Sequence, residues 1–225
     1  MRGVFITGTD TGVGKTHIGC SLIRALLDRG APVRARKPVE SGCPPRHGEL
    51  FPSDAMALSA AAGSRDAVNV VCPFPLEAPL APSRAAALAG QSLTLAQLLA
   101  ACRRDVAAED FLVVEGAGGF LSPLTEDGLN ADLARDLGLP VLLIAADRLG
   151  AMHQVLATAE AIVRRDLALA AVILNRVEPD LDPRLDNAAE LARWLDTTIV
   201  ALPYQSTGDP KAPLDALARE LLRDR

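Results

Sequence analysis

Short apolar runs alternate with longer segments of helical periodicity along this chain. Continuous apolar runs predict strands that are buried on both faces, and apolar residues three and four positions apart predict amphipathic helices. The expected strands are residues 3–7, 32–36, 111–114, 141–146, 171–174 and 199–202. The expected helices are residues 15–29, 53–62, 93–107, 131–137, 152–164, 184–195 and 214–222. Strands and helices in alternation predict the α/β class, with a parallel β-sheet that carries helices on both faces.

Turn-forming residues set the expected boundaries of these elements. Gly30 is expected to end the first helix, and Ser53 is expected to cap the second. The proline-rich residues 69–82 predict a loop, with a short extended piece at residues 70–74. Both flanks of this loop fit one sheet, and one core can still cover a chain of 225 residues. We therefore expect residues 1–225 to form a single domain.

Composition narrows the class of protein further. Hydrophobic residues make up 49% of the chain but aromatic residues only 3%, so Leu, Ala, Val and Ile must build the core. The net charge is −5 and no Lys/Arg cluster rises above it, which argues against nucleic acid as a partner. The N-terminal sequence predicts neither a signal peptide nor a membrane span. Four widely spaced cysteines without a C-x-x-C pair are typical of free thiols, so we expect a cytoplasmic protein.

The clearest motif lies between the first expected strand and the first expected helix. Residues 8–16 read Gly-Thr-Asp-Thr-Gly-Val-Gly-Lys-Thr, which is typical of a P-loop, whose backbone N–H groups and helix N-terminus bind phosphate. Lys15 can reach the β- and γ-phosphates, and the Thr16 hydroxyl can bind Mg²⁺. The strict motif has glycine where this chain has Thr9, and the nearest glycine is Gly8. The loop predicts binding of a nucleoside triphosphate with Mg²⁺.

Three charged residues outside the loop are candidates for the same site. Glu115 follows the expected strand 111–114, and open α/β sheets bind ligands at the carboxyl ends of their strands. Mg²⁺ prefers oxygen ligands, so Glu115 is a candidate, although a strand-end acid can also lie in ordinary solvent. Asp54 is in the first turn of an expected helix, where the helix dipole alone explains an acid. Lys37 can neutralise a transferring phosphoryl group, or equally be a solvated surface lysine.

Six segments together resemble the dethiobiotin synthetase family of the biotin pathway. They are residues 8–16, Lys-Pro-Val-Glu-Ser-Gly at 37–42, Ser-Asp-Ala at 53–55, Val-Glu-Gly-Ala-Gly-Gly at 114–119, Leu-Gly at 149–150, and Asn175. Their order and spacing are those of the family, and the chain has the family's length. Related P-loop ATPases lack the Lys-x-x-x-Ser segment beside Glu-Gly-Ala-Gly-Gly. The resemblance implies a fold of the P-loop NTPase type.

The resemblance also implies a reaction, that of an ATP-dependent cyclo-ligase. One amine of 7,8-diaminononanoate takes up CO₂, supplied as bicarbonate, to form a carbamate. ATP phosphorylates the carbamate, and the second amine closes the ureido ring with release of phosphate. The products are dethiobiotin, ADP and phosphate. Mg²⁺ and lysine side chains would offset the repulsion between the anionic carbamate and the γ-phosphate.

The matched motifs imply a role for each site residue. The implied catalytic residues are Lys37, Lys15 and Thr11, and the implied Mg²⁺ ligands are Thr16, Asp54 and Glu115. The implied ATP-binding residues are Gly12, Val13, Gly14, Lys15, Thr16, His17, Asp54, Glu115, Gly116, Ala117, Gly118, Asn175, Arg176, Pro203, Tyr204 and Gln205. The implied substrate-binding residues are Lys37, Ser41, Gly118, Leu149, Gly150, Ala151, Met152 and His153.

Nucleotide choice depends on Asn175, which matches the family's adenine contact but is also a common turn residue after a strand. The chain has Asn-Arg-Val-Glu at residues 175–178 rather than the Asn-Lys-x-Asp with which GTPases bind guanine, so ATP is the expected nucleotide.

Residues 149–153 imply a homodimer, because this segment receives the substrate carboxylate from a neighbouring subunit in the family. A helix N-terminus suits that anion. The chain departs from the family at three positions. His153 replaces a frequent asparagine, Gly12 replaces the glutamate of some members, and Ser83 replaces a frequent histidine.

Three other functions fit parts of the pattern. A partner-switching ATPase of the partitioning or septum-positioning type would carry a signature lysine where this chain has Asp10, and a terminal basic amphipathic helix that is absent here. A cobyrinate-type amidotransferase would need an additional glutaminase domain. A nucleotide-binding module without catalysis is distinguished only by assay.

Overall fold

A six-stranded parallel β-sheet is the centre of the computed structural model, which describes residues 1–180, 182–204 and 211–223. The strand order is β10-β9-β8-β1-β7-β2, and every neighbouring pair is parallel. The strands are β1 (Arg2–Gly8), β2 (Val33–Arg36), β7 (Phe111–Gly119), β8 (Val141–Ala146), β9 (Leu169–Asn175) and β10 (Thr198–Leu202). The α/β class predicted from the alternating pattern is confirmed.

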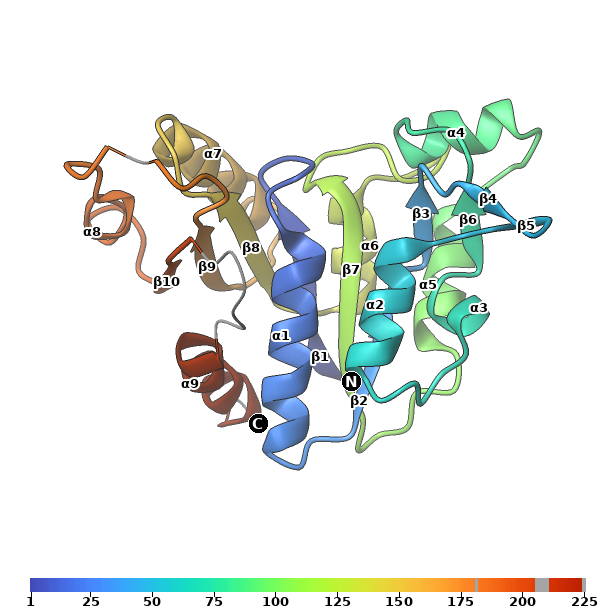
Figure 1. Cartoon of the computed structure of the whole chain (residues 1–225), viewed down its shortest axis with the longest axis horizontal. Helices are drawn as coiled ribbons and strands as arrows, with labels where there is room; N and C mark the ends of the chain where they lie inside the picture. The colour runs from blue at the N-terminus through green and yellow to red at the C-terminus, as the bar shows by residue number, and fades with distance from the viewer. Residues whose placement is uncertain (181, 205–210, 224–225) are drawn as a thin grey trace.

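Helices cover both faces of this sheet, as Figure 1 shows. On one face lie α1 (Lys15–Asp28), α2 (Ser53–Ala61) and α9 (Lys211–Arg223), and on the other α5 (Leu95–Arg103), α6 (Asn130–Leu137) and α7 (Ala151–Val163). Consecutive strand residues point to opposite faces, so Val4 and Ile6 pack with the first group of helices while Phe5 packs with the second. Both faces are therefore apolar, which explains the continuous apolar runs in the sequence.

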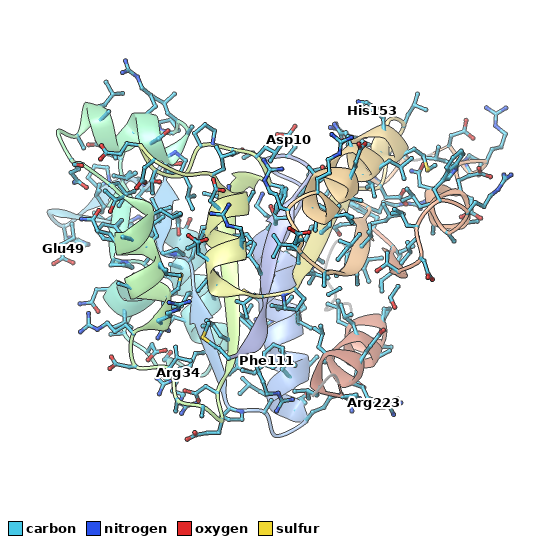
Figure 2. All side chains as sticks on the ribbon, turned by 180° about the vertical axis from the view of Figure 1, so that it is seen from behind. Asp10, Arg34, Glu49, Phe111, His153 and Arg223 are labelled. Atoms are coloured by element: carbon cyan, nitrogen blue, oxygen red, sulfur yellow. The ribbon has the colours of Figure 1, made fainter. Side chains whose placement is uncertain are left out.

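The strand order also determines where a ligand can bind. The chain leaves β1 towards β2 on one side, returns through β7, and then continues through β8 to β10 on the other side. Open parallel sheets bind ligands at such a reversal, beyond the carboxyl ends of the strands. Figure 2 shows Asp10 and His153 at that end of the molecule, and Arg34 and Phe111 at the opposite end.

The segment between β2 and α5 differs from the prediction. The expected loop at 69–82 contains part of a short helix, α3 (Val68–Val71), and a strand, β6 (Phe74–Leu76). The extended piece was therefore predicted too early in the chain. β6 pairs in parallel with β3 (Val39–Ser41), in a two-stranded sheet beside the main one. A second helix, α4 (Pro82–Leu88), begins with a proline, whose fixed φ suits the first helical position.

A small hairpin was also missed. β4 (Pro45–Arg46) pairs in antiparallel fashion with β5 (Glu49–Leu50), and the two turn residues, His47 and Gly48, both have positive φ. Two such residues are the requirement of a type I′ hairpin turn.

Three boundary predictions differ most from the structure. β7 does not end at 114 but continues to Gly119, because a buried asparagine supports its last residues. The helix expected at 93–107 ends at Arg103, before Asp105, whose φ of 55° is left-handed. The helix expected at 184–195 is reduced to α8 (Asn187–Leu191).

The expected capping of the second helix by Ser53 is also wrong. Ser53 is the first helical residue, Pro52 occupies the N-cap position, and neither side chain caps the helix. The first amides of α2 instead donate to Glu40, which lies on β3.

Two further expectations concern the whole chain. All four cysteines lie in the described part of the chain, all are buried, and no disulfide joins any two of them. Within the described ranges, no helix is both long enough and apolar enough to cross a membrane.

Candidate active site

The P-loop connects β1 to α1 at the centre of the sheet. Gly14 precedes the helix with a left-handed φ of 93°, and a Cβ atom there would collide with the side chain of Asn175. Glycine is therefore required at this position for two independent reasons. The amide of Thr9 donates to the carbonyl of Ile144 on β8 at 2.9 Å, which anchors the beginning of the loop.

Lys15 folds back over this loop. Its Nζ donates to the carbonyl oxygen of Asp10 at 2.9 Å, and its side chain is buried. Burial lowers the pKa of Lys15 to about 8; the charge of Lys37 acts in the same direction, while Glu115 opposes both. The amine is thus held where a bound phosphate can replace the Asp10 carbonyl as its partner.

Glu115 joins three elements at the carboxyl end of the sheet. Its Oε1 accepts from Thr16 Oγ1 at 2.8 Å and from Lys37 Nζ at 2.5 Å. Lys37 also pairs with Asp54 Oδ2 at 3.2 Å. Burial acts to lower the pKa of Lys37, but the charges of Glu115 and Asp54 outweigh it and raise the pKa above its ordinary value. Lys37 is therefore a buried cation held between two carboxylates, and not a solvated surface lysine.

The side chains around Glu115 fit a Mg²⁺ ion. Glu115 Oε2 is buried and has no hydrogen-bond partner, which is costly for a carboxylate oxygen unless a cation accompanies it. The Thr16 hydroxyl donates to the other oxygen of Glu115, and the half-exposed Asp54 carboxylate contacts Lys37, which Glu115 also contacts. No group of three or more His, Cys, Asp and Glu side chains able to hold a metal occurs among the described residues. A site of this kind suits Mg²⁺, which usually takes few protein ligands and adds phosphate oxygens and water.

The last residues of β7 form a bulge that Asn130 supports. β1 and β7 are in register up to Ile6 and Glu115, but Gly8 then pairs with Gly119. The Asn130 side chain accepts from the amide of Ala117 at 3.1 Å and donates to the carbonyls of Ala117 and Gly119 at 2.7 and 2.9 Å. A Cβ atom on Gly116 would collide with it, so the contact requires the small size of Gly116.

These elements enclose a cleft of about 630 Å³. Its walls are the P-loop, the residues after β2, the loop before α4, and the end of β7. The lining residues are Thr11, Gly12, Gly14, Lys15, Thr16, His17, Lys37, Glu40, Ser41, Asp54, Pro79, Leu80, Ala81, Pro82, Glu115, Ala117, Gly118 and Ser122. Lys15 and Lys37 line the cleft together with three carboxylates, and residues 79–82 add apolar side chains. Amines beside an apolar surface suit an anionic group attached to an alkyl chain.

A second, smaller pocket of about 210 Å³ lies beside it, and His17 lines both. Its other lining residues are Asn175, Arg176, Val177, Leu202, Pro203 and Tyr204. The Asn175 amide nitrogen donates to the carbonyl of Val13 at 3.0 Å, which leaves the Asn175 oxygen as an acceptor. A nucleotide with its phosphates at the P-loop would therefore have its base within reach of the smaller pocket.

Most of the predicted site residues meet in these two pockets, and four groups do not. Val13 is buried in the core and contributes its carbonyl, and Gly116 faces Asn130. The segment Leu149 to His153 lines neither pocket of its own chain. Gln205 lies outside the described residues.

Sequence reasoning missed several residues of the site. Ser122 lines the cleft, and its Oγ accepts from the amide of Gly119 at 2.9 Å. Glu40 and Asn130 are buried polar residues to which the sequence pattern gives no role, although Glu40 lies inside the matched segment 37–42. For Asn130 the sequence offers one signal, because asparagine is favoured at the start of a helix and residue 130 precedes the expected helix 131–137. For Glu40 the only signal is an acid that follows the expected strand 32–36.

A parallel sheet of this order, with a P-loop after its first strand and a buried acid on the neighbouring strand, defines a P-loop NTPase. Solved structures agree on the fold. The septum site-determining protein MinD from Pyrococcus horikoshii, complexed with Mg-ADP, superposes with a TM-score of 0.58 at 16% identity, covering 99% of this chain and 96% of that one. A ParA family ATPase from Chlorobium tepidum gives 0.57 at 14% identity, covering 100% and 99%.

Comparison of sequences identifies the family, which comparison of folds does not. A family model described as an AAA domain matches residues 2–211. An ATP-dependent dethiobiotin synthetase of Anaeromyxobacter dehalogenans is 47% identical over 86% of this chain and 85% of that relative. One from Ruthia magnifica is 39% identical over 88% and 90%. The chain belongs to the ATP-dependent dethiobiotin synthetase family, which confirms the prediction of a biotin-biosynthesis ligase that uses ATP.

Proposed function

We propose that this protein converts 7,8-diaminononanoate, CO₂ and ATP into dethiobiotin, ADP and phosphate. The observation that carries the proposal is Lys37, a buried cation on the wall of a cleft that Lys15 enters from the P-loop side. Two fixed amines on one cleft are what a reaction between two anions requires. The names of the relatives support the same substrates, since they share most of this chain's length.

The side chains divide the work in this proposal. CO₂ forms a bond to one amine nitrogen of the substrate, and that nitrogen loses a proton, which gives a carbamate. Lys37 and Thr11 hold the carbamate oxygen against the γ-phosphorus, while Lys15 and the P-loop amides hold the phosphates. The oxygen–phosphorus bond forms as the bond to ADP breaks. The second amine then attacks the carbonyl carbon, loses a proton and expels phosphate as the ring closes.

Thr16, Asp54 and Glu115 would hold Mg²⁺ in this scheme. When bound, the ion supplies positive charge to the phosphate oxygens during transfer. The unpartnered Glu115 oxygen supports this assignment.

ATP rather than GTP is supported by the direction of the Asn175 amide. Because its nitrogen donates to Val13, its oxygen is available as an acceptor towards the smaller pocket. Adenine presents an amino donor where guanine presents a carbonyl, so this acceptor favours ATP.

A homodimer is part of the proposal. Leu149 is 88% exposed, and Gly150 occupies the N-cap position of α7 with no side-chain cap. The amide of Ala151 donates to the carbonyl of Arg148 at 3.1 Å, so the amides of Met152 and His153 are the ones that another partner would accept from. A second copy of the chain would place residues 149–153 at the open end of the cleft, where they would bind the substrate carboxylate.

The test is phosphate release from MgATP with bicarbonate, measured with and without 7,8-diaminononanoate, and mass spectrometry of the product. Release that depends on the diamine, with dethiobiotin formed, is the expected result. The Lys15→Gln variant is the control and should release no phosphate. Release that ignores the diamine would overturn the proposal and indicate a partner-switching ATPase.

A further inference from the structure

Glu40 is a buried acid on β3 that the proposed reaction does not use. Its side chain lines the cleft and is 5% exposed. Its two carboxylate oxygens accept from two consecutive amides at the start of α2. Oε1 accepts from the amide of Asp54 at 3.0 Å, and Oε2 from the amide of Ala55 at 2.9 Å.

This contact replaces a cap that α2 lacks. Pro52 at the N-cap position has no acceptor in its side chain, and the helix has no side-chain cap of its own. The first amides of a helix need partners, and a carboxylate also interacts favourably with the positive end of the helix dipole. For stability alone, a serine or aspartate at position 52 would serve. Here the acceptor comes from a different element.

The strand that carries Glu40 is rigidly held. β3 pairs with β6, the amide of Cys43 donates to Leu76 at 2.9 Å, and the Cys43 thiol donates to the carbonyl of Glu40 at 3.3 Å. The next residue, Ser41, lines the cleft. Glu40 thus connects the strand that bears a proposed substrate contact to the helix that bears a proposed Mg²⁺ ligand.

Asp54 has few other restraints. Its side chain is 44% exposed, so packing does not determine its direction, and its carboxylate contacts Lys37. Its backbone amide is held by Glu40. A partly exposed ligand keeps its direction only if its backbone and the groups around it are fixed.

We infer that Glu40 is a positioning residue, which fixes the start of α2 so that the Asp54 carboxylate faces Glu115 and the bound metal. The inference rests on the proposed function, since it deepens the role given there to Asp54. Glu40 acts through Asp54 and does not itself contact the ion or the substrate.

The test measures metal affinity rather than turnover. Mn²⁺ replaces Mg²⁺, and free Mn²⁺ is followed by electron paramagnetic resonance in the full chain with ADP bound. Glu40→Gln keeps the shape but offers only one acceptor oxygen to the two amides, and should weaken Mn²⁺ binding about tenfold. ADP affinity without metal should stay unchanged. Glu40→Asp withdraws the carboxylate by one methylene, should also weaken Mn²⁺ binding, and serves if Glu40→Gln does not fold.

A double-variant cycle with Asp54→Asn separates positioning from simple stabilisation. Asp54→Asn should itself weaken Mn²⁺ binding, and adding Glu40→Gln should then weaken it no further. Glu49→Gln is the matched control, because Glu49 is exposed on the neighbouring hairpin (Figure 2), and should bind Mn²⁺ as the wild type does.

Two results would overturn the inference: a folded Glu40→Gln or Glu40→Asp variant with wild-type Mn²⁺ affinity, or effects that add fully in the double variant. A lower melting temperature with unchanged Mn²⁺ affinity would mean that Glu40 only stabilises the helix. Failure of the proposed function has a different signature, because the wild type would then form no dethiobiotin, or Asp54→Asn would bind Mn²⁺ normally.

Discussion

Lys15 and Lys37 are two buried amines in one cleft with different surroundings. Lys15 donates to a neutral carbonyl of its own loop, whereas Lys37 lies between the carboxylates of Glu115 and Asp54. A neutral partner is easily replaced by a phosphate oxygen. A cation between two carboxylates is positioned before any ligand arrives, and preorganised charge of this kind is what stabilises a transition state.

The variant Lys37→Leu tests this division of labour. Turnover should fall about 100- to 1,000-fold, because the charge facing the transferring phosphoryl group is lost. ADP affinity should change little, because the P-loop contacts remain. Phosphate release and calorimetric ADP titration measure the two effects. Lys15→Gln, by contrast, should weaken ADP binding. A Lys37→Leu variant unable to bind ADP would contradict the assignment.

At the scale of one element, the bulge of β7 is supported by a single side chain. Asn130, at the start of α6, makes three hydrogen bonds to the backbone of Ala117 and Gly119 and is fully buried. Ala117 and Gly119 flank Gly118, and Ala117 and Gly118 line the cleft, so the Asn130 side chain shapes one wall of the cleft.

Replacement of Asn130 by alanine should lower the free energy of unfolding by about 3 kcal/mol, at roughly 1 kcal/mol for each lost hydrogen bond. Urea denaturation measures the change. Asn69→Ala is the matched control, because Asn69 is exposed on α3, and it should leave stability nearly unchanged. Equal free energies of unfolding for the two variants would mean that water replaces the hydrogen bonds of the Asn130 side chain without a loss of stability.

At the scale of the whole molecule, a charged network closes the end of the sheet opposite the cleft. Asp110, just before β7, accepts from the amide of Ala107 at 2.9 Å, from Arg34 at 3.1 Å and from Arg65 at 2.7 Å. Arg34 and Arg36 on the edge strand β2 both pair with Asp66. Burial acts to raise the pKa of Asp110, but these donors outweigh it and hold the pKa below its ordinary value.

This network predicts how stability depends on pH. Because the pKa of Asp110 is lower in the folded state, its contribution is complete above about pH 4, the range of an unfolded aspartate, and is lost as pH falls through the folded pKa. Asp110→Asn should therefore lower the free energy of unfolding by about 3 kcal/mol at pH 7, with a smaller difference towards pH 2. Urea denaturation across this range measures it, with the exposed neighbour Glu109→Gln as control. A difference independent of pH would contradict the assignment.

The proposed homodimer predicts that two inactive variants restore activity together. Lys37→Leu removes the proposed catalytic lysine, and Gly150→Val is strained at a φ of 91° and should distort the start of α7. If each cleft uses both protomers, half of the dimers in an equal mixture are mixed and one of their two sites is intact. Activity should recover to about a quarter of the wild-type value after co-refolding or co-expression. No recovery would mean that each chain completes its own site.

The sequence by itself determined the features that depend on neighbouring residues. Strand and helix periods are local, so the α/β alternation and five of the principal strands could be placed closely. The P-loop is also local, because a strand, a glycine-rich turn and a helix follow one another, and so Lys15 and Thr16 could be assigned from spacing. For Lys37 and Asp54 the pattern left a bland explanation open, and only the family resemblance favoured the site.

Only the tertiary structure decided the features whose partners are distant in the chain. Glu115 contacts Thr16 and Lys37, which lie 99 and 78 residues away in the chain. Glu40 caps a helix that starts 13 residues later. Asn130 supports the last residues of β7, a strand that the apolar pattern alone ends at residue 114. The pairing of β3 with β6 is another case, because each segment by itself is too short or too rich in proline to be predicted as a strand. The physical reason is that a buried polar group is stabilised by whichever partner the fold brings to it, and sequence spacing carries no record of that partner.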